Sequence, residues 1–120
     1  MKVAVTAQEP QTKSRIDTRF GRAKWVVIVD TNTGEVQVRD NKVNLNAIQG
    51  AGIQTGQNIS NLHVDAVITG NMGPNAYKVL NAAGVKIYLA SNETVERAVI
   101  ALKTGKLQQI KKANVDGHWI

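Results

Sequence analysis

Residues 65–89, DAVITGNMGPNAYKVLNAAGVKIYL, contain two apolar strands joined by a helix. The runs 65–69 and 85–89 are rich in the aliphatic and β-branched residues that are typical of buried strands. Between them, Pro74 suits the first position of a helix, where its missing N–H needs no partner, and Gly84 suits the position just after the helix end. This order predicts a βαβ unit with parallel strands.

The residues before this unit add three further strands. Alternating Val and Ala residues predict a strand over 2–7, and the near-continuous apolar run 25–29 predicts a buried one. The turn-forming sequence 30–34 is followed by strict alternation over 35–39, which is typical of a β-hairpin. Together with the two strands within 65–89, these segments predict a sheet of five strands.

Two more helices flank the βαβ unit. One is expected over 53–62, after Gly50-Ala51-Gly52, although its apolar positions are sparse. The other follows Asn92, a candidate N-cap, has its apolar residues on one face and ends at Thr104-Gly105. The predicted molecule therefore has three helices.

The order of these elements predicts one ribonuclease-H-like α/β domain over residues 1–105, followed by a basic, flexible tail over 106–120. With strands numbered along the chain, we expect the spatial order 3-2-1-4-5, with the hairpin antiparallel and the other pairs parallel. An edge strand over 107–110 is the alternative to a tail that is solvated from its first residue.

The composition restricts the function. The chain has 120 residues with 15 Lys and Arg against 9 Asp and Glu, a net charge of +6, so an anionic partner is expected. The absence of cysteine excludes disulfides and cysteine-ligated metal sites. No run of about 18 apolar residues and no signal peptide is found, which predicts a cytoplasmic protein without membrane insertion.

The carboxyl ends of the parallel strands should lie at one edge of the sheet, where the two neighbours of the first strand diverge. Four loops are expected to meet there: residues 8–24, 41–50, 70–73 and 90–92. Three helix N-termini face this edge, each with about half a positive charge. Arg19 and Arg22 add to that charge, so we expect the edge to bind an anion larger than phosphate.

Three short blocks fall on these loops: RFGRA at 19–23, GAGIQ at 50–54 and TGNMGPNA at 69–76. They resemble the dinitrogenase iron–molybdenum cofactor biosynthesis family, and the resemblance covers nearly the whole chain. It implies a noncatalytic protein that carries or stores metal–sulfur clusters. It is nearest to the cysteine-free orange-protein branch of sulfate-reducing bacteria, which implies a noncovalently held molybdenum–copper–sulfide cluster. An iron–molybdenum cofactor precursor for nitrogenase assembly is the alternative cargo.

The resemblance also implies which residues bind the cluster. They are Arg19, Phe20, Gly21, Arg22, Gly50, Ala51, Gly52, Ile53, Asn71, Met72, Gly73 and Asn75. The Met72 thioether suits copper, and His63 and His118 are further candidate metal ligands. Arg19 stands where many relatives have His, which puts direct ligation there in doubt. MinD-type ATPases are the protein partners that the resemblance implies, and the chain is expected to be a monomer or a cluster-bridged dimer.

Each of these residues also has a simpler interpretation. Phe20 and Met72 can be core residues, Arg22 can pair with Asp17, and the glycines can be helix caps. His63 is expected at the opposite edge of the sheet. These interpretations stay open at the level of sequence.

Other classes of function find little support. The nine carboxylates form no obvious pair for two-metal catalysis, and no Gly-Lys-Ser/Thr phosphate cradle is present. Ser14, Ser60 and Ser91 have no histidine expected within reach, so the chain is not expected to be an enzyme. A basic module that binds nucleic acid or protein is the remaining alternative. Aromatic residues make up only 4% of the chain, and this scarcity argues against nucleic-acid binding, because bases stack on aromatic side chains.

Overall fold

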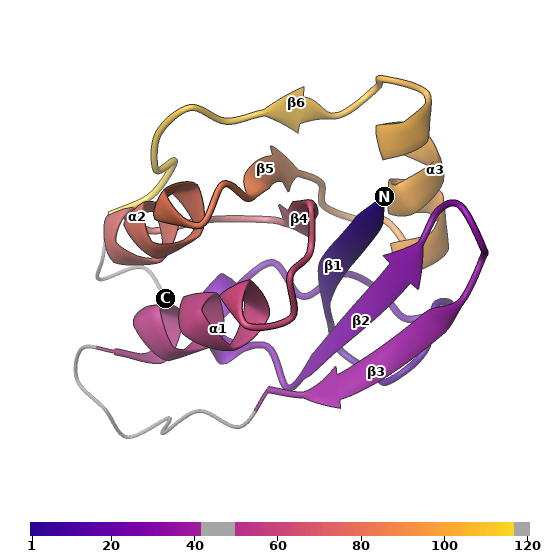
Figure 1. Ribbon diagram of the computed structural model, residues 1–120, viewed down its shortest axis with the longest axis horizontal. Helices are drawn as coiled ribbons and strands as arrows, with labels where there is room; N and C mark the ends of the chain where they lie inside the picture. Colours follow the sequence, from indigo (N-terminus) through magenta and orange to yellow (C-terminus); the bar gives the residue numbers. More distant parts are fainter. Residues whose placement is uncertain (42–49, 117–120) are drawn as a thin grey trace.

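A computed structural model describes residues 1–41 and 50–116, and over these residues the chain forms three layers (Figure 1). The strands are β1 (Lys2–Ala7), β2 (Trp25–Asp30), β3 (Val36–Asp40), β4 (Ala66–Thr69), β5 (Lys86–Leu89) and β6 (Gln108–Gln109). The helices are α1 (Ala51–Ser60), α2 (Pro74–Ala82) and α3 (Val95–Lys103), and η1 (Phe20–Arg22) is a 3-10 turn. None of these helices is long and apolar enough to cross a membrane.

The strands form one mixed sheet in the order β3-β2-β1-β4-β5-β6. The first strand lies inside it, antiparallel to β2, with Val5 opposite Val27, and parallel to β4, with Val5 opposite Ile68. The β4 and β5 strands are parallel because α2 crosses over between them. The predicted order of the first five strands is therefore confirmed, and the neighbours of β1 diverge as expected.

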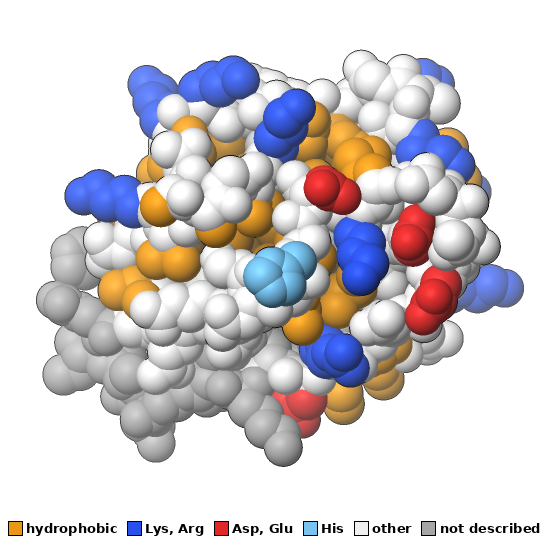
Figure 2. Space-filling model, in the orientation of Figure 1, with side chains coloured by type: hydrophobic (Ala, Val, Ile, Leu, Met, Phe, Trp, Pro, Cys, Tyr) orange, Lys and Arg blue, Asp and Glu red, His pale blue; other side chains and the backbone are white. Residues whose placement is uncertain are grey.

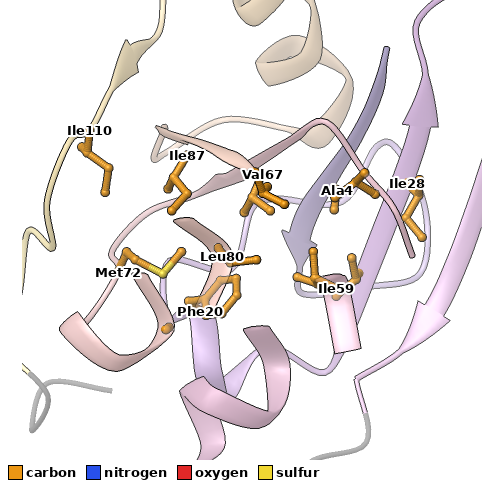
Figure 3. Close-up of a cluster of buried hydrophobic side chains, with 13 residues drawn as sticks. Ala4, Phe20, Ile28, Ile59, Val67, Met72, Leu80, Ile87 and Ile110 are labelled. Atoms are coloured by element: carbon orange, nitrogen blue, oxygen red, sulfur yellow. The ribbon is translucent and has the colours of Figure 1, made fainter. Parts of the chain in front are cut away.

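Alternation along β1 supplies both layers of the core. Ala4 belongs to a cluster with Ile59 of α1 and Leu80 of α2, so these two helices cover one face (Figure 3). Val3 and Val5 face the other way and pack with α3. Burying one such aliphatic side chain contributes about 1.5–3 kcal/mol, so the two clusters hold the helices on the sheet.

The end of the described chain differs from the prediction, because β6 adds a sixth strand. It pairs antiparallel with β5, and the N–H of Ile110 donates to the Ile87 carbonyl at 2.9 Å. The Ile110 side chain is buried against the same cluster as Ala4. An edge strand within 107–110, the alternative to a solvated tail, is therefore present, and it consists of Gln108–Gln109. His118 and the other residues of 117–120 lie outside the described residues.

Helix beginnings also differ from the expected positions. Helix α1 begins at Ala51, two residues before the predicted start. The N-cap of α3 is Thr94, whose side chain accepts from the N–H of Arg97 at 3.3 Å, whereas Asn92 has φ of 55° and lies outside the helix. Helix α2 begins at Pro74 as predicted.

Candidate functional site

The loop after β1 lies directly on the beginning of α1. A Cβ atom added to Gly21 would lie 2.7 Å from the amide nitrogen of Gly52 and 2.9 Å from its Cα. Neither backbone atom can move without displacing a helix, so glycine is required on geometric grounds. This close approach brings together two of the three sequence blocks.

The third block meets the same loop. A Cβ atom on Gly70 would lie 2.5 Å from the Cβ of Thr18 and 2.6 Å from its Cα. The Asn71 side chain donates to the Thr18 carbonyl at 3.2 Å, and Arg19 forms an isolated parallel bridge with Asn71. The loops that follow β1 and β4 are therefore locked together. We refer to residues 18–22, 50–53 and 70–75 as the cradle.

Two helix N-termini border the cradle. Gly50 and Gly73 are the N-caps of α1 and α2, and neither supplies a side-chain acceptor. The first turn of each helix also has no acidic residue. The positive ends of both helix dipoles are therefore left without a compensating side-chain charge in their own first turns, as in sites that bind anions.

The N-terminus of α3 also lies against the loop after β1, but its N–H groups already have partners within the protein. The carbonyl of Ser14 accepts from Val95 N–H at 2.9 Å, and the carbonyl of Thr12 accepts from Glu96 N–H at 3.0 Å. Together with the Thr94 cap, these bonds satisfy the first turn of α3. The loop after β1 thus occupies the N-terminus of α3, whereas the N-termini of α1 and α2 border the cradle.

The charged groups near the cradle come mainly from the same loop. The Arg19 side chain is 57% exposed, and its Nε lies 3.8 Å from Oδ1 of Asp17, so these two residues form an ion pair. The same oxygen accepts from the Arg19 N–H at 3.0 Å. The half-buried Arg22 ends η1, and its N–H donates to the Arg19 carbonyl at 3.1 Å. An exposed arginine with a surface ion pair is readily available to an anion.

The side chains of two cradle residues, Phe20 and Met72, lie in the core. Both side chains are fully buried in the cluster that contains Leu80, and Figure 3 shows the Met72 thioether directed into it. Packing therefore accounts for the positions of both residues. Met72 therefore contributes its backbone groups to the loop that leads to α2 and its side chain to the core.

The remaining predicted residues divide between the cradle and the rest of the surface. Ala51 and Gly52 are buried in the first turn of α1, Ile53 is half-buried beside them, and Asn75 is exposed at the start of α2. His63 lies in the turn between α1 and β4, at the opposite edge of the sheet, and is exposed. Lys and Arg side chains are spread over the face seen in Figure 2 and form no single basic stripe there.

Asn114 is a part of this region that the sequence did not reveal. Its side-chain oxygen accepts from the Met72 N–H at 2.6 Å, and its side-chain nitrogen donates to Oδ1 of Asn71 at 3.0 Å. It lies in the segment expected to be a solvated tail, and no local pattern in the sequence points to this contact. Only the sheet pairing of β6 brings it here.

The family of the chain is shown by a match over residues 1–105 to the model described as dinitrogenase iron–molybdenum cofactor. The chain belongs to this family. The apo form of the orange protein from Desulfovibrio gigas is 33% identical, with a TM-score of 0.91 over 95% of this chain and 96% of that one.

Two further proteins are similar to the chain. A NifB-like DUF35 protein from Thermotoga is 32% identical, with a TM-score of 0.83 over 97% of this chain and 98% of that one. An uncharacterised protein of Methanocaldococcus jannaschii is 29% identical over 113 residues, which is 92% of each chain. Each of these three similarities extends over more than nine-tenths of this chain.

Proposed function

We propose that this chain is a noncatalytic carrier that holds an anionic metal–sulfur cluster in the cradle without covalent ligation. The observation that carries the proposal is the convergence of η1 and the N-termini of α1 and α2, fixed by the contacts of Gly21 and Gly70. Backbone N–H groups and arginine side chains bind anionic groups through charge-assisted hydrogen bonds. Membership of the dinitrogenase iron–molybdenum cofactor family supports a cluster as the anion.

The residues available favour noncovalent holding. The chain has no cysteine, and its described residues contain no group of three His, Asp or Glu side chains arranged for a metal ion. A cluster already saturated with sulfide needs no thiolate from the protein, because its charge can be met by N–H donors. We therefore propose a molybdenum–copper–sulfide cluster as the cargo, supported by the similarity to the orange protein. A precursor of the iron–molybdenum cofactor is the second cargo, supported by the family match.

A titration of the apoprotein with tetrathiomolybdate and copper tests the proposal. Gel filtration would follow, with molybdenum, copper and sulfur quantified in the protein peak. We expect a coloured complex of fixed stoichiometry with the wild type. Removal of one charge in Arg19→Ala or Arg22→Ala should weaken it about tenfold, because a charge-assisted hydrogen bond contributes about 1.5–3 kcal/mol.

Lys86→Ala is the matched control, because it removes one positive charge at the exposed amino end of β5, opposite the cradle. It should bind as the wild type does. Metals that elute apart from the wild-type protein would overturn the molybdenum–copper–sulfide cargo, and the same titration would then be run with an iron–molybdenum precursor. Equal losses in all three variants would instead indicate attraction to the overall charge. The interaction with MinD-type ATPases and the choice between monomer and cluster-bridged dimer remain predictions.

A further inference from the structure

A single residue near the end of the described chain fixes the backbone of Met72. Oδ1 of the Asn114 side chain accepts from the Met72 N–H at 2.6 Å, and the backbone N–H of Asn114 donates to the Met72 carbonyl at 3.1 Å. The N–H of Val115 lies 3.4 Å from the same carbonyl oxygen. Both polar backbone groups of Met72 are therefore bonded to a residue 42 positions later in the chain.

The same side chain reaches the other loops through Asn71. The Asn114 nitrogen donates to Oδ1 of Asn71 at 3.0 Å, and the Asn71 nitrogen donates to the Thr18 carbonyl at 3.2 Å. The bonds leave Asn71 one orientation, with its oxygen toward Asn114 and its nitrogen toward Thr18. A continuous hydrogen-bonded chain thus joins the loop after β1, the loop after β4 and the C-terminal segment.

The direction of the Met72 carbonyl matters for an anion in the cradle. This residue directly precedes Gly73, the N-cap of α2, so its peptide groups lie next to the positive end of that helix. A carbonyl oxygen turned toward the anion would repel it, whereas this carbonyl is directed to Asn114 and Val115. The backbone N–H groups of Asn114 and Val115 thus keep partial negative charge away from the α2 N-terminus, and the Asn114 side chain fixes the same residue by accepting from the Met72 N–H.

From these contacts we infer that Asn114 is a positioning residue for the anionic cargo. It acts through the Met72 peptide and Asn71, which it holds so that the N-terminus of α2 remains available to the anion. The inference rests on the proposed function of the cradle. It adds residues 107–115 to that site, where the sequence predicted a separate tail.

Asn114→Ala in the full chain tests the inference with three measurements. Affinity for tetrathiomolybdate with copper should fall about tenfold, because the two side-chain hydrogen bonds that hold the Met72 peptide and Asn71 are lost. Amide hydrogen exchange at Met72 should be about tenfold faster, because its N–H loses its acceptor. The urea midpoint of unfolding should fall only slightly, because Asn114 is exposed and water can replace the two lost side-chain hydrogen bonds. Asn81→Ala, which truncates an exposed asparagine at the far end of α2, should change none of the three.

Each alternative outcome has a distinct meaning. Wild-type affinity in Asn114→Ala would overturn the positioning role alone, and so would unchanged exchange at Met72. A loss of affinity in proportion to a large fall in the urea midpoint would identify a merely structural residue. Failure of the wild type to bind the metals would overturn the molybdenum–copper–sulfide cargo, and the positioning of that cargo with it.

Discussion

At the scale of single residues, Gly21 and Gly70 allow the loops of the cradle to approach one another closely. Gly70 lies so close to Thr18 that a Cβ atom would come within 2.7 Å of three of its atoms, including its Cα. Rotation of the Thr18 side chain cannot relieve a contact with Cα. The loops after β1 and β4 would have to separate, and the hydrogen bond between Asn71 and Thr18 would lengthen with them.

Gly70→Ala should therefore destabilise the fold by about 2 kcal/mol, within the usual range for overpacked sites. Urea unfolding would measure the free energy, and tetrathiomolybdate titration would measure the accompanying loss of affinity. Gly56→Ala is the control, because its nearest new contact is the Val79 side chain at 3.2 Å and alanine favours the helix. Equal free energies of unfolding for the two variants would contradict the role given to the Thr18 contact.

At the scale of elements, β6 is short but well anchored. It has two residues, yet the following Ile110 is buried in the same cluster as Phe20 and Met72. Figure 3 shows Ile110 entering this cluster from the outer edge of the sheet, beyond Ile87. The segment 107–115 therefore belongs to the folded domain and holds Asn114 in place.

Ile110→Ala should lower the free energy of unfolding by about 2–4 kcal/mol, because it leaves a cavity in the core. Amide exchange at Met72 should also increase, because the Asn114 contacts depend on the anchored segment. Val36→Ala is the control, since the Val36 side chain is 44% exposed on β3. An unfolding free energy equal to that of the wild type would mean that β6 is not part of the cooperative unit.

The sequence predicted those elements that have a local signal. Apolar runs, together with Pro74 at the helix start and Gly84 after the helix end, were sufficient to predict the βαβ unit. Burial and capping of these elements follow from neighbouring residues in the sequence. The β6 strand is too short for any periodicity, and the occupied N-terminus of α3 depends on Ser14, some 80 positions earlier in the sequence. The meeting of the loops that carry the three cradle blocks could be predicted from the strand order, but the contacts of Asn114 could not, because its partners are set by tertiary structure alone.

At the scale of the whole molecule, the charge acts on the rate of encounter. The chain has a net charge of +6, and the Lys and Arg side chains on the face seen in Figure 2 lie apart from one another. A field of this kind attracts anions from solution, but it is screened over about 10 Å at 0.1 M salt. Local hydrogen bonds in the cradle are screened much less.

Raising sodium chloride from about 50 to about 500 mM should therefore slow the association of tetrathiomolybdate several-fold, because the Debye length shortens. The dissociation rate should change by less than twofold, because it depends on short-range hydrogen bonds between the protein and the bound anion. Stopped-flow absorbance would measure both rates. A dissociation rate that rises as steeply as the association rate falls would indicate loose surface binding.

The link between Asn114 and Met72 also bears on when the site forms during synthesis. Residues of β1 are made first, yet they are paired with β4 and their loop is closed against Glu93 and Val95, which emerge much later. The final contacts come from residue 114. A nascent chain on the ribosome thus lacks the contacts between Met72 and Asn114 until residue 114 has emerged, so the proposed cluster site is incomplete before that point of synthesis.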